Sequence, residues 1–386
     1  MKSSIESSPR MSGPKASAKA PPAAASTSIN REAVLYMVLL SLQFAFQPFL
    51  TRKFTPTTIC RSTVILMQEL LKLFLAFVML CVSGAYESSV TGWNISTWIR
   101  VAFVPAALYA VQSMAALMAY QTLDALTFNV LNQTKTLSAA LCCYLVMRRR
   151  QSCMQIISLF ILLLSALVME NIVPLNFMGE GSEIEIKLES HHWTHGVLPI
   201  MLASFISGLA GALVQKNLQA QGGGRNSYLL TMELSAASAL ILCVSLTMSP
   251  DGKTIVEQGF WHGWMPETWI PILTQSLGGI VVGLVIKHAG SVRKGFALIF
   301  GMFLSGLVQA FVTHEGVSIE QGIGGFLAAL SLWMHVSHPY VSNDERTAAA
   351  TLPTSWQDLL ACVSPEDDLD ELAEPLLQRY LFPGPK

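Results

Sequence analysis

Charged residues are scarce in this chain of 386 residues. They make up 13% of it, against about 25% in soluble domains, whereas 52% of the chain is hydrophobic. The net charge is only −1, and no basic stripe with interleaved aromatic residues appears, so nucleic acid is not an expected partner. The composition predicts a protein that crosses a lipid bilayer several times, with the bilayer as its main surroundings.

Paired cysteines and metal-ligand spacings are also missing. The seven cysteines fall mostly in apolar runs and form no C-x-x-C pair, which excludes a disulfide or zinc framework. His191, His192 and His195 share one polar loop, but no cysteine or well-spaced further ligand accompanies them. We therefore expect a surface loop there and no metal site.

Catalytic motifs are absent as well. The sequence has no nucleophile–base set and no Gly-rich phosphate loop of the Walker type. Neither an enzyme, nor a cofactor, nor the direct use of ATP is therefore expected. Any chemistry must come from polar side chains that lie within the apolar runs.

Apolar segments follow one another from Ala33, each close to the roughly 20 residues that span a bilayer as a helix. The expected crossings lie near 33–50, 62–83, 98–121, 125–147, 153–172, 196–219, 228–249, 269–288, 294–313 and 321–338. The predicted fold is an all-α membrane protein with ten transmembrane helices. Residues 1–30 are expected to form a disordered N-terminal tail, and residues 342–386 an acidic C-terminal tail.

Two halves of five crossings are predicted, residues 31–172 and 196–341, joined by a polar loop at 173–195. The fifteen residues from Gln155 and the fifteen from Gln321 coincide at five places without a gap. This similarity aligns the fifth crossing with the tenth. The two halves are therefore offset by five crossings, which is an odd number, so equivalent helices run in opposite directions across the membrane. The two repeats should therefore be inverted with respect to the membrane, and such carriers place their site at the repeat interface.

Basic residues in the short loops predict the orientation. With a cytosolic N-terminus, nine Lys and Arg residues fall in cytosolic loops and five on the opposite side. Both tails are then cytosolic, and the 173–195 loop lies on the other side.

Small residues recur at helical spacing in several later crossings, which favours close helix packing. They are Ser207, Gly208, Gly211, Gly278, Gly279, Gly283, Gly301 and Ser305. Sliding of helices past one another is the alternative interpretation.

Lys135 lies inside the apolar run 125–147, and Arg148, Arg149 and Arg150 already mark its end. An ammonium group near the bilayer centre costs roughly 2.5–3.5 kcal/mol on insertion, and intramembrane charges commonly mark substrate paths. The alternative is a lysine that extends from a helix end to the lipid headgroups. Lys135 corresponds in the repeat to Lys294, at the start of the ninth crossing.

Two lysines among amides predict a site for an anionic, hydrogen-bonding solute. Lys294 opens a helix, so its ammonium and the free N–H groups can address the same anion. Polar partners for a base or sugar are Gln112, Ser113, Asn129, Gln133 and Gln275, and rings for stacking are Phe128 and Tyr120. Each amide alone could instead join helices.

Four further charges are gating or structural candidates. Glu69 and Lys72, spaced i,i+3, should neutralise each other on one helix face. Glu233 is a lone acid within an apolar run, without a partner evident in the sequence. Lys287 lies at the end of the eighth crossing.

Several segments resemble the nucleotide-sugar transporters of the drug/metabolite transporter superfamily, over about residues 33–338. They are Tyr109–Ala115, Leu123–Lys135, Gln275–Gly279 and Lys287–Phe296. The Leu131–Thr136 segment, Leu-Asn-Gln-Thr-Lys-Thr, is similar to plant endoplasmic-reticulum carriers of UDP-N-acetylglucosamine and UDP-N-acetylgalactosamine. The resemblance implies ten helices and an antiport in which cytosolic nucleotide sugar enters the endoplasmic-reticulum or Golgi lumen and nucleoside monophosphate leaves.

The resemblance also implies roles for individual residues. Lys135 and Lys294 match the lysines that contact phosphate, and Gln112 and Ser113 fall where members contact the nucleobase. Residues 230–233 read Leu-Thr-Met-Glu where relatives have Arg-Asn-x-Gln, which leaves base and sugar open. The alternatives are CMP-sialic acid, UDP-galactose, another phosphorylated solute, or a non-transporting membrane regulator. The oligomeric state stays open, with a homodimer as one alternative.

Overall fold

The computed structural model describes residues 31–56, 58–123, 128, 131–169, 193–220, 224–313 and 319–339, and these contain helices and no strand. In the first half the helices are α1 (Arg31–Phe54), α2 (Arg61–Val82), α3 (Tyr86–Val90), α4 (Ile95–Trp98), η1 (Ile99–Phe103), α5 (Val104–Thr122), α7 (Lys135–Met147) and α8 (Cys153–Met169). In the second half they are η2 (Trp193–Val197), α10 (Leu198–Leu218), α11 (Ser227–Met248), α12 (Pro250–Gln258), η3 (Pro266–Thr268), α13 (Trp269–His288), α14 (Ser291–Thr313) and α15 (Ile319–Ser337).

Seven helices are long and apolar enough to cross a membrane by length and composition. They span Arg31–Phe54, Arg61–Val82, Ile95–Thr122, Trp193–Leu218, Ser227–Met248, Pro266–His288 and Ser291–Val312, and α8 is a shorter apolar helix. The prediction of an all-α membrane protein is thus confirmed. α7, α8 and α15 lie where the fourth, fifth and tenth crossings are expected, and the full set of ten stays a prediction.

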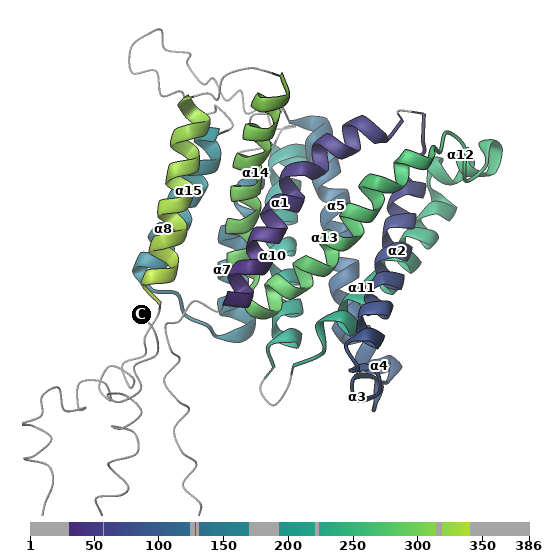
Figure 1. The fold of residues 1–386 in the computed structure, drawn as a ribbon, viewed down its shortest axis with the longest axis horizontal. Helices are drawn as coiled ribbons and strands as arrows, with labels where there is room; N and C mark the ends of the chain where they lie inside the picture. Colours follow the sequence, from purple (N-terminus) through teal and green to yellow (C-terminus); the bar gives the residue numbers. More distant parts are fainter. Residues whose placement is uncertain are drawn as a thin grey trace, which may run out of the picture.

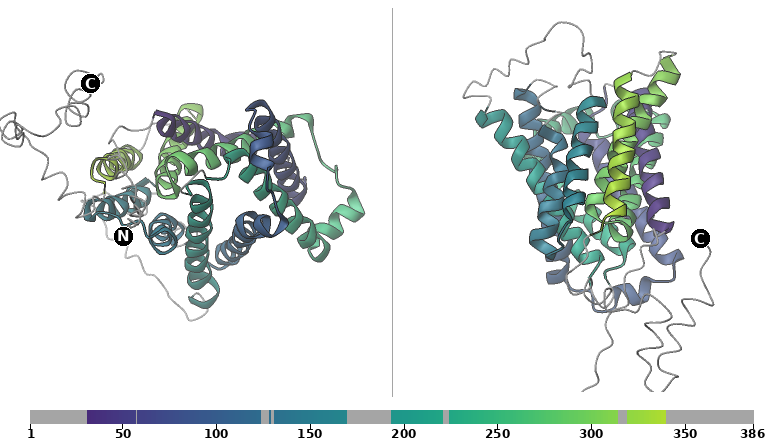
Figure 2. Two further views of the ribbon diagram at one scale, coloured as in Figure 1. Left: turned by 90° about the horizontal axis from the view of Figure 1, so that it is seen from below. Right: turned by 90° about the vertical axis from the view of Figure 1, so that its left-hand side faces the viewer.

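The helices form a bundle in which six pairs make the most extensive contacts. α8 packs on α15 at one edge of the bundle, and α2 packs on α11 toward the other (Figure 1). Between them, α10 lies against α5 and α7, and α1 lies against α13 and α14. The view along the bundle in Figure 2 again has the α8–α15 pair and α12 at opposite edges.

Two connections contain helices that the sequence analysis did not predict. α3 and α4 lie between α2 and α5, and α12 lies between α11 and α13, at opposite ends of the bundle in Figure 1. Each of the three is at most nine residues long, too short for periodicity to mark it in the sequence. The side-chain oxygens of Asn94 and Ser249 accept hydrogen bonds from the backbone N–H groups of Ser96 and Gly252, which caps α4 and α12.

The α8–α15 contact is polar as well as apolar. The Ser165 hydroxyl donates to the Gly324 carbonyl at 2.9 Å, and the Ser331 hydroxyl donates to the Ser158 carbonyl. In the repeat alignment, Ser165 corresponds to Ser331 and Ser158 to Gly324, so the two bonds are equivalent under exchange of the halves. Both hydroxyls are fully buried and gain partners that the bilayer cannot offer.

Close helix packing accounts for two of the small residues that recur at helical spacing in the later crossings. A Cβ on Gly208 would lie 2.6 Å from the Ser138 backbone on α7, and one on Gly279 would lie 2.5 Å from the Lys72 side chain on α2. A larger residue at 208 would push against the α7 backbone, whereas one at 279 would displace the Lys72 side chain. The packing interpretation of these two positions is confirmed.

Candidate functional site

Lys135 is the first residue of α7, so the fourth predicted crossing is not one uninterrupted helix. Residues 131–133 are helical, Thr134 is a turn residue, and α7 starts directly after it. The Thr134 hydroxyl donates to the Leu131 carbonyl at 2.6 Å, which satisfies an acceptor at this break. The half-buried ammonium therefore stands at a helix N-terminus, whose dipole favours an anion.

Lys294 lies in the first turn of α14, next to α7. A Cβ on Gly295 would lie 2.8 Å from the Thr136 side chain, so the two helix starts touch directly. The two lysines thus stand at adjoining helix starts, where like charges repel each other. Within the described residues, neither lysine forms an ion pair with a carboxylate. This is a local excess of positive charge.

Three amides have hydrogen-bonding atoms without a partner in the described part of the chain; two directly precede the start of α7, whereas no described contact joins the third, Gln112, to either lysine. The side chains of Gln112 on α5 and Gln133 make no hydrogen bond within the described part of the chain, and the buried Asn132 Oδ1 has no partner there. Asn129 lies outside the described residues. Ser113 is exposed, and its hydroxyl donates to the Tyr109 carbonyl at 2.9 Å.

Phe128 forms an aromatic pair with Tyr120. Their ring centroids lie 5.2 Å apart with an interplanar angle of 82°, an edge-to-face contact. Phe128 also packs against the apolar cluster that includes Leu123 and Ile200. One face of the Phe128 ring is thus held by α5 and α10.

Gln275 belongs to a different group of amides. Gln43 on α1 donates to Gln275 Oε1 at 3.2 Å and to Gln47 Oε1 at 3.4 Å, and Gln47 in turn donates to the Pro271 carbonyl. These bonds join α1 to α13. No described contact joins Gln275 to either lysine, so the structure does not bring it into the same cluster.

The predicted neutralisation of Glu69 by Lys72 is confirmed. Lys72 Nζ lies 2.7 Å from Glu69 Oε1, and both side chains are largely buried. The Lys72 stem rests against Gly279 of α13, so the pair lies between α2 and α13. Lys287 is exposed in the last turn of α13.

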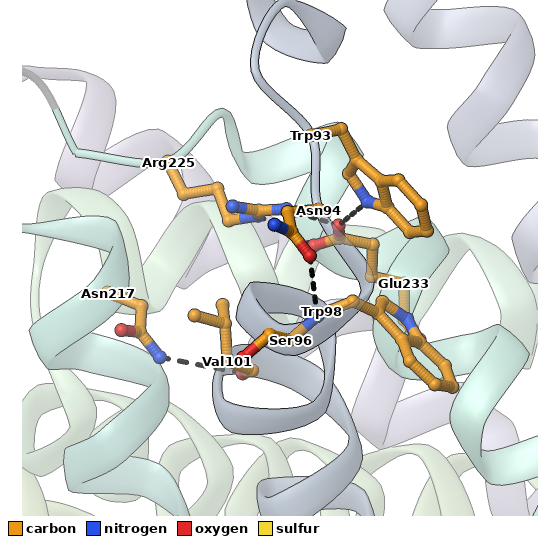
Figure 3. A network of polar contacts seen from close by, with 8 residues as sticks. All are labelled: Trp93, Asn94, Ser96, Trp98, Val101, Asn217, Arg225 and Glu233. Atoms are coloured by element: carbon orange, nitrogen blue, oxygen red, sulfur yellow. Dashed lines mark hydrogen bonds and ion pairs between the residues drawn. The ribbon is translucent and has the colours of Figure 1, made fainter.

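Glu233 is not the lone acid that the sequence indicates. Its buried carboxylate accepts hydrogen bonds from Arg225 Nε at 2.6 Å and from Trp93 Nε1 at 2.7 Å, and it also pairs with Arg225 Nη2 (Figure 3). The Trp98 indole donates to the Glu233 carbonyl at 3.4 Å. These bonds tie the segment before η1 to α11. This network could not be predicted from the sequence, because its members lie on three separate segments.

Two further residues were missed, Gln215 on α10 and Gln219 directly after its last residue. The signal in the sequence is a pair of amides spaced i,i+4 within an apolar span. The Gln215 side chain is buried and contacts the start of α14, and Gln219 contacts the end of α13.

The fold and these contacts define a polytopic helical membrane protein with two lysines inside it that pair with no described carboxylate. A family model described as nucleotide-sugar transporter matches residues 28–335. The chain belongs to the nucleotide-sugar transporter family. Its members are transporters, which confirms the prediction that the chain is not an enzyme.

Individual relatives cover most of the chain. It is 32% identical to the UDP-N-acetylglucosamine transporter ROCK1 of Arabidopsis thaliana over 83% of this chain and 96% of that protein. It is 26% identical to the UDP-galactose transporter of Schizosaccharomyces pombe over 78% of this chain and 84% of that protein. One crystal structure shares the fold with a TM-score of 0.57, at 12% identity, over 80% of this chain and 97% of that one.

Proposed function

We propose that this protein exchanges a UDP-sugar for UMP across an internal membrane, with UDP-N-acetylglucosamine or UDP-N-acetylgalactosamine as the sugar nucleotide. The observation that carries the proposal is the pair Lys135 and Lys294, two lysines without a described carboxylate partner at adjoining helix starts. Burying charge without a partner is costly, so a counter-charge has to come from elsewhere. The diphosphate of the UDP-sugar would provide the negative charge in one direction of the exchange, and the monophosphate of UMP would provide it in the other.

The base and sugar would be held by the groups around the lysines. Gln112, Gln133 and Asn132 have amide atoms without a described partner, and such atoms can pair with a uracil or an acetamido group. The Phe128 ring offers a face for stacking. The similarity to the Arabidopsis transporter supports N-acetylglucosamine, whereas the yeast relative keeps galactose as the second alternative.

An inverted two-repeat architecture of ten helices is part of the proposal. Exchanging α1 with α10, α2 with α11, α5 with α13, α7 with α14 and α8 with α15 turns the six most extensive helix pairs into one another. The equivalent bonds of Ser165 and Ser331 obey the same exchange. Lys135 and Lys294 are then equivalent residues of the two repeats, which supports a site at the repeat interface.

The direct test is uptake into proteoliposomes that contain the purified protein and are preloaded with UMP. We expect uptake of radiolabelled UDP-N-acetylhexosamine, little uptake of CMP-sialic acid, and a strict need for internal nucleotide. Uptake of UDP-galactose alone would move the assignment to the second alternative. Uptake of no nucleotide sugar by correctly inserted protein would refute a transporter and favour a regulator.

The orientation is proposed from the charge distribution. Both tails would be cytosolic, and the membrane would be that of the endoplasmic reticulum or Golgi. The start of α1 and the end of α15 lie at the same end of the bundle in Figure 1, which supports tails on one side. We expect tags at both termini to be cleaved by protease in intact microsomes. Protection of either tag until detergent is added would contradict this topology.

A further inference from the structure

We propose that Gln215 is a positioning residue for Lys294, an inference that rests on the proposed function. Gln215 lies on α10 and is only 4% exposed. Its Oε1 accepts a hydrogen bond from the backbone N–H of Ser291 at 2.8 Å, the first residue of α14. The same oxygen accepts from Cys143 Sγ on α7 at 3.4 Å. One amide oxygen therefore joins the two helices that carry the lysines.

The adjoining Gln219 extends this contact to the end of α13. Its Nε2 donates to the carbonyls of Ile286 and Lys287 at 2.9 and 2.8 Å, in the last turn of α13, and the Ile286 carbonyl also accepts from the Gly290 N–H at 3.1 Å. Gln219 Oε1 accepts from Gln215 Nε2 at 3.0 Å and from Arg149 at 2.8 Å. The two glutamines thus cap both sides of the α13–α14 connection from a third helix.

The geometry of the connection requires this support. Only Ala289 and Gly290 separate α13 from α14, and Gly290 has a positive φ of 92°. A Cβ at Gly290 would lie 3.0 Å from Gln215 Nε2, so the turn rests directly on that side chain. The turn fixes where α14 begins, and Lys294 follows Ser291 by three residues, on the same face of the helix.

The α10 face that carries Gln215 also receives α7. Gly208, Gly211 and Gln215 are spaced i, i+3, i+7 and lie along one stripe of the helix. Gly208 admits the α7 backbone, and Gly211 admits the Ser291 hydroxyl, which would lie 2.5 Å from an added Cβ. This stripe is a common surface against which the starts of α14 and α7 are set side by side.

The chemistry of an amide suits this position. A glutamate at 215 would still accept from the Ser291 N–H, but its negative charge would lie beside the cationic cluster and compete with the phosphate of the substrate. A leucine would keep the packing and lose the acceptor. Gln215 holds α14 without supplying a counter-charge, so the charge of Lys294 stays available for the solute.

The experiment compares Gln215→Leu and Gln215→Glu with the wild type in UMP-preloaded proteoliposomes. We expect KM for both UDP-N-acetylglucosamine and UMP to rise about tenfold in Gln215→Leu, with kcat changed less. A larger rise is expected in Gln215→Glu, and inhibition of uptake by external pyrophosphate should weaken in parallel. Gln215→Met also removes the acceptor and keeps the length of the side chain, so it decides the question if Gln215→Leu fails to insert.

The matched control is Gln155→Leu, because Gln155 is also buried but, among the described residues, its side chain bonds to Ser152 just before α8 and to His335 of α15 and not to α7 or α14. Its KM should stay at the wild-type value, even if less protein is recovered. A wild-type KM in well-inserted Gln215→Leu, or in Gln215→Met if Gln215→Leu fails to insert, would overturn the positioning role. A wild-type protein that exchanges no nucleotide would instead refute the proposed function, so the two failures are distinguishable.

Discussion

Exchange of UDP-sugar and of free UMP is expected to be lost together when Lys135 is replaced by alanine. Both solutes carry the phosphate that we assign to this ammonium, and no described protein carboxylate takes its place. Removing one partner of a desolvated charge pair costs about 2–5 kcal/mol, which corresponds to roughly 30-fold to several thousandfold in affinity. Uptake and counterflow with radiolabelled UMP measure the two exchanges separately.

The amount of inserted protein has to be measured alongside. Lys135→Ala should insert at least as well as the wild type, because it removes a costly buried charge and its repulsion with Lys294. Lys135→Arg should recover little activity, since a planar guanidinium does not occupy the place of a compact ammonium. Lys253→Ala on α12 is the matched control with full activity expected, because Lys253 is exposed and lies outside the predicted spans. Normal exchange by well-inserted Lys135→Ala would show that Lys135 does not bind the substrate phosphate.

Periodic and local features of the sequence were sufficient for much of the fold. The lengths of the apolar runs predicted the positions of the long helices, and the i,i+3 spacing predicted the Glu69–Lys72 ion pair. Both features depend on residues that are neighbours along one helix. The helix break at Thr134 was not predicted, since no glycine or proline marks it. It nevertheless decides that Lys135 stands at a helix start.

Contacts between segments that are far apart in the sequence could not be predicted from local residue patterns. Gln215 and Ser291 are 76 positions apart, and Trp93 and Glu233 are 140 apart. Only the packing of α10 on α14 and of the α3–α4 region on α11 brings them together. An amide or acid in an apolar run signals that a partner exists, because the bilayer supplies none, but it does not say which residue the partner is.

The largest expected loss of stability follows from removing the guanidinium from Glu233. In Arg225→Met the carboxylate, 3% exposed, would keep only the Trp93 indole as a described side-chain partner. Leaving a buried charge without its partner costs about 3–5 kcal/mol. We expect a marked decrease in the thermal denaturation midpoint of the detergent-solubilised protein, and a smaller one for Trp93→Phe, which removes one hydrogen bond.

Two comparisons make this expectation specific. Arg225→Met combined with Glu233→Leu should recover much of the lost stability, because no buried charge then remains and an apolar pair replaces the ion pair. Lys72→Met is the matched control at the other ion pair, where the Glu69 side chain is 17% exposed against 3% for Glu233, so its midpoint should fall less. If the double variant is no more stable than Arg225→Met alone, the cost does not come from the unpaired carboxylate, and the network acts chiefly through its packing of Trp93 and Trp98 onto α11.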